Sequence, residues 1–422
     1  MTPYRVRPVD GPLSATVEVP GSKSVANRAL VCAALAQGDS LLHAVAPGDD
    51  TAAMLACLSL LGAGVEDSGG AEIRITGADG QLRPGPHTLD ARLAGTTSRF
   101  VTAVSALGPG PYKVDGAPPL RTRPMTPLHD ALVALGARID AGERWGHLPV
   151  TVRGPLRVGG EVAVRGDGSS QYITALMLIA PYLTGGLTIR MTTPLVSAPY
   201  VRMTAAVMAA FGADVSSVGD AAVVVPEGRY RGCEYVVEPD ASSASYPLAA
   251  AAIAGGTVHV PGVTVASLQG DAAFARILDD MGCDVRIDDR GTTVSRQGPL
   301  RGVDIDMADV SDLVPSVAAV APFATTPTTI RGVGFIRGKE SDRIGDLCDE
   351  LRRAGITATD RVDGLTVVPG HPHPATFVTH HDHRLAMALS LIGLVVDGVE
   401  IDDAAVITKS WPGFWQMLED LA

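Results

Sequence analysis

The sequence is poor in aromatic residues, in cysteine and in positive charge. Phe, Trp and Tyr make up only 4% of the 422 residues, so the core must be built mainly from Ala, Val, Leu and Ile. The formal net charge of −12 argues against nucleic acid as the main partner, because binding to a phosphate backbone relies on a basic surface. An acidic chain can still hold a small anion where its basic residues converge.

The five cysteines are odd in number and none forms a CxxC pair. This usage indicates reduced, buried thiols rather than disulfides. The first residues lead into no apolar stretch of a signal peptide, and no apolar run approaches the ~20 residues of a membrane span. The sequence therefore predicts a cytoplasmic protein with no membrane partner.

Two kinds of helix alternate along the chain. One is rich in Ala, Leu and Val and is followed by a Gly turn and a strand, as in residues 31–45 and 247–260. The other is amphipathic and ends at a Gly before a strand, as at residues 61–65 and 281–285. The alternation gives about six units of about 70 residues, which predicts a repeated α/β architecture.

The length favours two domains of three repeats each, because 422 residues exceed one ordinary core. The first domain is expected over residues 14–236, opening with the alternating strand pattern at 15–19. The second is expected over 237–422 together with residues 1–13. No Gly/Ser-rich linker separates the halves, so the boundary is expected to be a strand that crosses between them.

Basic residues stand at the start of several predicted helices, where the positive end of the helix dipole disfavours them. They are Lys23, Arg99, Arg123, Lys339, Arg343, Arg384 and Lys409. Repeated exceptions in equivalent places suggest a function that offsets their cost, namely the binding of a phosphate-like anion in a cleft between the halves. For residues 20–28 taken alone, a capped helix with solvated basic residues remains the alternative.

Two other motifs are rejected. Gly21-Ser22-Lys23-Ser24 is similar to the end of a P-loop, but the first glycine and the spacer of that motif are missing. The second motif is a group of histidines without metal-ligand spacing, His371, His373, His380, His381 and His383. Solvated or hydrogen-bonded histidines are the favoured interpretation, and no metal is expected.

Eight motifs, in order and over nearly the whole chain, resemble those of the EPSP synthase (3-phosphoshikimate 1-carboxyvinyltransferase) family. They are PGSKSVANRAL, LAGTTSRF, RTRPMTPL, GSSQYITALML, SAPY, GKESDR, DHRLAMA and TKSWPGF. The resemblance implies a two-domain inside-out α/β barrel, each domain having three βαβαββ-like units. It also implies transfer of the enolpyruvyl group of phosphoenolpyruvate to the 5-hydroxyl of shikimate 3-phosphate, without a metal or organic cofactor.

The resemblance also implies roles for individual residues. Contacts to shikimate 3-phosphate are implied for Lys23, Ser24, Arg28, Ser169, Ser170, Gln171 and Ser197, with Lys23 and Gln171 also facing phosphoenolpyruvate. Contacts to phosphoenolpyruvate are implied for Gly95, Arg123, Arg343, Arg384 and Lys409. Asp312 would meet the shikimate hydroxyls beside Lys339, and Glu340 would be the second catalytic carboxylate. The catalytic set is thus Asp312, Glu340 and Lys23, in a chain expected to act as a monomer.

Two alternatives compete with this interpretation. The UDP-N-acetylglucosamine enolpyruvyl transferase shares the fold and the donor, but it normally carries a reactive Cys before the arginine that matches Arg123. Residues 116–120 contain no thiol, which argues against a nucleotide-sugar acceptor. The other alternative, a non-catalytic anion-binding protein, predicts the loss of an acid, a base or a phosphate-binding arginine, and none is missing.

Overall fold

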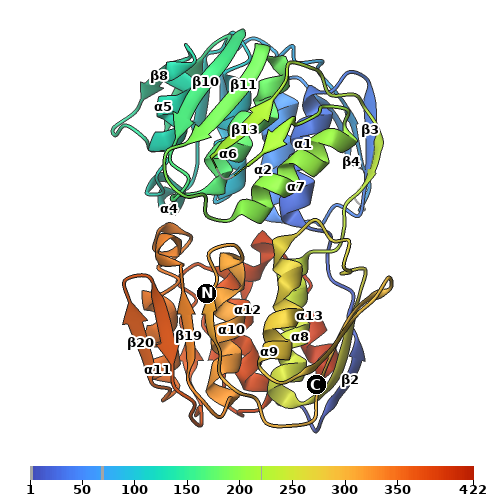
Figure 1. Ribbon diagram of the computed structural model, residues 1–422, viewed down its shortest axis with the longest axis vertical. Helices are drawn as coiled ribbons and strands as arrows, with labels where there is room; N and C mark the ends of the chain where they lie inside the picture. Colours follow the sequence, from blue (N-terminus) through green and yellow to red (C-terminus); the bar gives the residue numbers. More distant parts are fainter. Residues whose placement is uncertain (1–2, 68–70, 220) are drawn as a thin grey trace. The chain divides into compact units, whose positions relative to one another are not determined.

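The computed structural model describes residues 3–67, 71–219 and 221–422, which form two compact units (Figure 1). One unit is a single stretch, Gly21–Val237, and is called the continuous unit. The other combines Met1–Pro20 with Glu238–Ala422 and is called the split unit. Each unit has its own hydrophobic core.

The continuous unit contains three four-stranded sheets, with strand orders β14-β3-β5-β4, β6-β7-β9-β8 and β10-β11-β13-β12. Its strands are β3 (Asp39–His43), β4 (Gly64–Asp67), β5 (Ile73–Thr76), β6 (His87–Asp90), β7 (Tyr112–Asp115), β8 (Arg138–Ala141), β9 (Val150–Arg153), β10 (Val158–Val164), β11 (Thr184–Met191), β12 (Ser217–Val218), β13 (Ala222–Val225) and β14 (Glu234–Val236). Its helices are α1 (Lys23–Leu35), α2 (Asp49–Leu61), α3 (Gly95–Ser105), α4 (Pro118–Arg121), α5 (Thr126–Ala134), α6 (Ser170–Ile179), the 3₁₀ helix η1 (Ala180–Tyr182) and α7 (Ala198–Ala210).

The split unit contains the sheets β16-β17-β15-β2, β18-β19-β21-β20 and β1-β23-β22. Its strands are β1 (Tyr4–Arg5), β2 (Leu13–Thr16), β15 (Gly256–Pro261), β16 (Asp284–Ile287), β17 (Gly291–Arg296), β18 (Asp304–Asp306), β19 (Thr328–Arg331), β20 (Ala358–Arg361), β21 (Gly364–Val367), β22 (Thr376–Phe377) and β23 (Glu400–Ile401). Its helices are α8 (Ala241–Ala254), α9 (Phe274–Asp280), α10 (Val314–Val320), α11 (Gly345–Arg353), α12 (His383–Ser390) and α13 (Phe414–Leu421). Its 3₁₀ helices are η2 (Gly270–Ala273), η3 (Ser311–Leu313), η4 (Ala321–Phe323), η5 (Gly334–Gly338), η6 (Leu391–Leu394) and η7 (Ala404–Lys409).

The same small sheet recurs in both units. In each sheet two neighbouring strands run parallel, and they are either connected by a helix or come from distant parts of the chain. Every further strand pairs antiparallel with its neighbour. In the second repeat, for example, β6 leads through α3 to the parallel strand β7, and α5 leads on to the hairpin β8–β9. The predicted α/β class with repeated βα units is confirmed.

The first boundary differs from the predicted domain 14–236. Strand β2, expected to open the first domain, pairs in parallel with β15 of the split unit. Strand β14, which directly precedes α8 in the chain, pairs instead with β3 of the continuous unit. The two strands that lead into α1 and α8 have thus exchanged sheets, a long-range pairing that local alternation cannot reveal.

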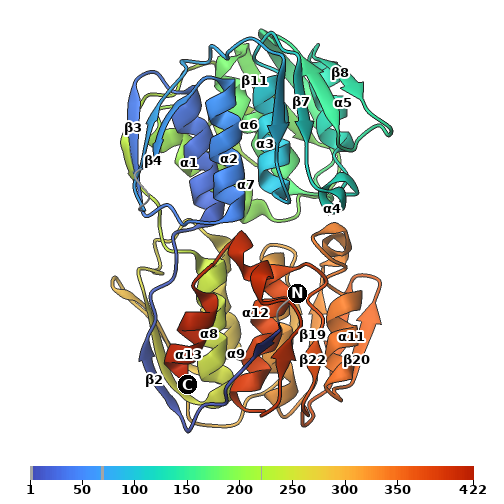
Figure 2. The ribbon, with the colours of Figure 1, turned by 180° about the vertical axis from the view of Figure 1, so that it is seen from behind.

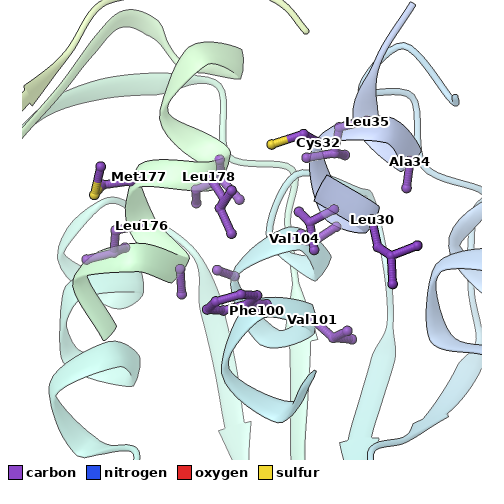
Figure 3. Close-up of a cluster of buried hydrophobic side chains, with 14 of the residues drawn as sticks. Leu30, Cys32, Ala34, Leu35, Phe100, Val101, Val104, Leu176, Met177 and Leu178 are labelled. Carbon is purple, nitrogen blue, oxygen red and sulfur yellow. The ribbon is translucent and has the colours of Figure 1, made fainter. Parts of the chain in front are cut away.

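The helices that begin the repeats are almost wholly buried. In α1 every residue from Val25 to Leu35 is buried, and α8 is buried from Ala241 to Ile253. Figure 3 shows side chains of α1, α3 and α6 packed together, among them Leu30, Phe100 and Leu176. Small Ala, Val and Leu side chains allow these helices to approach closely, which explains how a core forms with so few aromatic rings.

The same helices run side by side within each unit, with the sheets outside them, as the view from behind also shows (Figure 2). The five cysteines carry no disulfide, and four of them are buried. Burial raises the pKa of Cys57 to about 12 and that of Cys283 to about 11. No helix in the described part of the chain combines the length and apolar composition needed to cross a membrane.

We expect Gly21→Ala to destabilise the continuous unit by about 1–3 kcal/mol, the usual cost of overpacking. A Cβ at Gly21 would overlap the carbonyl oxygen of Ala44, which is backbone and cannot rotate away, and would press on Val237. Urea unfolding measures the change. Gly11→Ala is the matched control, because nothing lies within 4 Å of a Cβ there. Equal stability of the two variants would contradict the prediction.

Candidate active site

Helix α1 begins with a cap and a half-buried cation. Ser22 accepts a hydrogen bond from the Val25 amide at 3.4 Å, as an N-cap residue does. The next residue, Lys23, places its Nζ 3.0 Å from Oδ2 of Asp50 at the start of α2. The Lys23 side chain is only 15% exposed, so the alternative of a solvated basic residue is wrong here. Asp50 offsets the cost of a cation at the positive end of the helix.

Arg28 lies inside the helix packing. Its Nε donates to Thr204 at 2.8 Å and its Nη1 to the Ser24 carbonyl at 2.7 Å, while Nη2 donates to Thr174 and to the Tyr200 carbonyl at 3.4 Å. Burial lowers the pKa of Arg28 to about 10. The guanidinium therefore joins α1, α6 and α7, and four protein oxygens occupy its donors.

Two guanidinium groups meet at the start of α3. A Cβ at Gly95 would lie 2.6 Å from Nη1 of Arg123 and 2.9 Å from Nη1 of Arg99. Arg99 donates to the Gly95 carbonyl at 3.0 Å and to the Pro124 carbonyl at 3.0 Å. A side chain at this position would force both guanidinium groups to shift, which gives Gly95 a physical reason for its identity.

The starts of α6 and α7 are polar and uncharged. Ser169 caps α6 by accepting from the Gln171 amide at 3.3 Å, and Ser170 beside it is buried. Nε2 of Gln171 donates to Thr96 of α3 at 3.3 Å, next to Gly95. Ser197 precedes α7 with φ 56°, in the left-handed region that favours glycine. Apart from Arg28, which lies farther along α1, and Arg123, which lies between α4 and α5, the candidate residues of the continuous unit thus lie at the N-terminal ends of α1, α3, α6 and α7.

In the split unit, Arg343 is the hub of a charge network. Its Nη1 lies 2.9 Å from Asp312, its Nη2 2.8 Å from Glu340 and its Nε 2.6 Å from Asp382. The residue is 1% exposed. Burial lowers the pKa of Arg343, but the carboxylates of Asp382, Glu340 and Asp312 outweigh that effect and raise it above its usual range.

Asp312 is surrounded by cations. Arg384 lies 2.8 Å from its Oδ2, and Lys339 lies 3.6 Å and Arg343 2.9 Å from its Oδ1. Burial alone would raise the pKa of Asp312, but Arg384, Lys339 and Arg343 together hold it well below its usual range. Lys409 completes the set with its Nζ 3.7 Å from Glu340. All six predicted residues of this unit, Asp312, Lys339, Glu340, Arg343, Arg384 and Lys409, are brought together.

Three carboxylates near the candidate residues were absent from the sequence-based set. Asp50 pairs with Lys23, and Asp382 pairs with Arg343 and caps α12 by accepting from the Arg384 amide at 2.9 Å. The third, Asp271, is buried and accepts a hydrogen bond from Ser242 of α8. A helix-capping signal existed for Asp382, which directly precedes a predicted helix, but none existed for Asp271.

Asp271→Asn is expected to stabilise the protein at pH 7. Burial, and then the charge of Asp312, raise the pKa of Asp271 from 3.8 to about 6, against the opposing effects of Ser242 and Arg384. A carboxyl whose pKa is raised on folding stabilises below its unfolded pKa, and that contribution is lost as the pH rises to about 6. Urea unfolding between pH 4 and pH 7 should show this loss, on the order of 3 kcal/mol, in the parent chain and not in the variant. Parallel pH profiles would contradict it.

At least one of the grouped histidines, His380, is hydrogen-bonded, as expected from the sequence. His380 lies 3.0 Å from Oε1 of Glu350, which is buried and also accepts from the Val378 amide at 2.9 Å. Within residues 3–67, 71–219 and 221–422, no group of three or more His, Cys, Asp or Glu side chains could hold a metal ion.

The fold and the charged helix starts define a class, a repeated α/β protein with cations and carboxylates arranged for small, multiply charged anions. The family model of EPSP synthase (3-phosphoshikimate 1-carboxyvinyltransferase) matches residues 9–418. The chain belongs to this family. The predicted membership is confirmed.

Individual relatives agree with this assignment. The 3-phosphoshikimate 1-carboxyvinyltransferase of Nostoc punctiforme is 42% identical over 425 residues, covering 99% of this chain and 100% of the relative. That of Methanosphaerula palustris is 40% identical and covers 97% of each chain. The solved EPSP synthase of Acinetobacter baumannii has a TM-score of 0.85 at 24% identity and covers 100% of this chain and 98% of its own, which shows the shared fold.

Proposed function

We propose that the chain transfers the enolpyruvyl group of phosphoenolpyruvate to the 5-hydroxyl of shikimate 3-phosphate and releases phosphate. Family membership supports the reaction. The main observation that supports the assignment of catalytic residues is that the guanidinium of Arg343 pairs with both Asp312 and Glu340. A reaction that moves one proton onto a methylene and another off a hydroxyl needs two such groups at fixed positions.

The acceptor is assigned to the helix starts of the continuous unit. The assigned residues are Lys23, Ser24, Arg28, Ser169, Ser170, Gln171 and Ser197. Backbone N–H groups at helix starts and serine hydroxyls suit the oxygens of a phosphate monoester. Since Arg28 donates to the Ser24 carbonyl, we assign it the orientation of this helix start together with its positive charge.

The donor is assigned to the remaining cations and to the glycine beside them. The assigned residues are Gly95, Arg123, Arg343, Arg384 and Lys409, with Lys23 also facing the donor and Lys339 beside Asp312. Arginine forks match the paired oxygens of carboxylate and phosphate, and lysines add point charges.

The chemistry proceeds by addition and elimination. Asp312 takes the proton of the 5-hydroxyl while Glu340 gives a proton to the methylene, and the hydroxyl oxygen forms its bond to the adjacent carbon. The C–O bond to phosphate then breaks, Asp312 returns its proton to the departing phosphate, and the methyl group returns a proton to Glu340 as the double bond is restored. Cations around both substrates stabilise the charges that form, and the two carboxylates balance the cationic carbon.

Donor binding also explains how Asp312 becomes an effective base. Arg384, Lys339 and Arg343 hold the pKa of Asp312 down against the effect of burial. An anionic donor on Arg384 and Arg343 would share their charge, so the pKa of Asp312 would rise towards a useful value. The base is thereby activated only when the donor is in place.

A phosphate-release assay tests the proposal. Release should require phosphoenolpyruvate and shikimate 3-phosphate together, with neither alone sufficient. The matched control replaces shikimate 3-phosphate by UDP-N-acetylglucosamine. Release with the UDP-sugar and not with shikimate 3-phosphate would overturn the proposal in favour of the nucleotide-sugar enzyme, and no release with either acceptor would reject catalysis.

A further inference from the structure

The carbonyl oxygen of Pro124 receives hydrogen bonds from two different helices. Nη2 of Arg99 on α3 donates at 3.0 Å, and the hydroxyl of Tyr172 on α6 donates at 2.6 Å. Tyr172 is 4% exposed, so its hydroxyl is held by packing. The side chain before it, Gln171, and the start of α3 at Gly95 are both assigned to substrate.

This carbonyl anchors the segment that carries Arg123. Residues 122–125 connect α4 to α5. The Arg123 amide donates to the Leu120 carbonyl at 3.1 Å, and the Met125 carbonyl accepts from the Leu128 and His129 amides at 3.0 and 3.1 Å. Met125 donates its amide to the Gly146 carbonyl at 2.7 Å. Pro124 has no N–H, so its carbonyl is its one backbone group for hydrogen bonding. The ring of Pro124 is exposed and gives the segment little packing.

The position of this segment matters because Arg123 is buried in a confined place beside Gly95. Its Nη1 lies where a Cβ of Gly95 would be 2.6 Å away, and Nη1 of Arg99 lies 2.9 Å from the same point. A backbone fixed at Pro124 keeps Arg123 at this place, and Arg99 contributes through its own hydrogen bond to the Pro124 carbonyl.

We infer that Tyr172 is a positioning residue for Arg123, acting through the Pro124 carbonyl. Its hydroxyl fixes the backbone next to Arg123 and so aims the guanidinium at the anionic donor. This inference rests on the proposed function, because it assigns Arg123 to phosphoenolpyruvate. Tyr172 itself touches neither substrate in this role.

Tyr172→Phe removes the hydroxyl and keeps the ring. We expect the KM for phosphoenolpyruvate to rise about fivefold, the effect of one lost hydrogen bond, while the KM for shikimate 3-phosphate and kcat change less than about twofold. Tyr112→Phe is the matched control, since the buried Tyr112 donates its hydroxyl to the Arg83 carbonyl at 2.8 Å, in a contact that involves no candidate residue. It should leave both KM values unchanged.

A double-substitution cycle separates positioning from general loosening. In an Arg123→Lys background, Tyr172→Phe should add less than about a twofold change in the KM for phosphoenolpyruvate, because the group that it aims is gone. A full fivefold effect in that background, an equal rise in both KM values, or no change in the single variant would each overturn the inference. Absence of phosphate release by the unsubstituted protein would overturn the proposed function and this inference with it, whereas release with an unchanged KM overturns the inference alone.

Discussion

Asp312→Asn is expected to lower kcat by about 10²–10⁴-fold, the range for loss of a positioned general base. The amide keeps the shape of the side chain but cannot accept the hydroxyl proton. The substitution also removes the negative charge that Arg384 and Arg343 share, so these cations should hold the donor at least as tightly as before. Steady-state phosphate release gives kcat and KM for each substrate.

Glu340→Gln is the companion variant. It removes the carboxyl that Arg343 and Lys409 hold at 2.8 Å and 3.7 Å, and it should lower kcat by a comparable factor without weakening binding. Asp360→Asn serves as a control, because Asp360 is a carboxylate of the same unit that pairs with Arg337 outside the network. Unchanged kcat in Asp312→Asn or in Glu340→Gln would show that the role of that residue is misassigned.

Arg343→Met is expected to remove activity and to cost about 3–5 kcal/mol of unfolding free energy, as breaking a buried ion pair does. Three carboxylates, Asp312, Glu340 and Asp382, would lose their shared partner at a site where Arg343 is 1% exposed. Urea unfolding at pH 7 measures the loss.

Two comparisons make the Arg343 result interpretable. Arg343→Lys keeps the charge but cannot reach three carboxylates, so it should recover part of the stability and little of the activity. Arg331→Met removes an arginine that is 59% exposed and pairs with Asp304, which is 64% exposed, so it should cost less than about 1 kcal/mol. Equal stability of Arg343→Met and the parent chain would show that the network does not hold the fold together.

Local sequence signals predicted much of the candidate site. The cations at helix starts can be predicted from the sequence, because a helix start is recognised from a few neighbouring residues. The carboxylates that pair with these cations cannot be predicted in this way. Lys23 and Asp50 belong to different helices, and the pairing of Arg343 with Asp382 spans 39 positions. Tertiary packing determines which residues form such pairs, and sequence patterns do not contain that information.

The same limit explains the error in the domain boundary. The alternation at residues 15–19 correctly indicates a strand near that position, but the face and partner of a strand depend on the whole sheet. The structure places β2 beside β15, far along the chain. Arg28 is a second example, because its motif predicts a cation near an anion site, and only the packed helices reveal that protein oxygens occupy its donors.

The exchange of β2 and β14 makes the continuous unit an insertion within the split unit. The continuous unit has all its strands in one stretch of chain, so a ribosome can finish it before the split unit is complete. The split unit cannot fold until its second segment has been synthesised. Pairing its two segments closes a loop that contains the whole continuous unit, and this loop is effectively shorter once the continuous unit has folded. Its two ends already meet, since Tyr4 stacks on Trp415 with ring centroids 4.1 Å apart. If the gene were rearranged so that the two ends of the split unit were joined, and the chain were cut after residue 20 and before residue 238, each unit would be encoded by one uninterrupted segment.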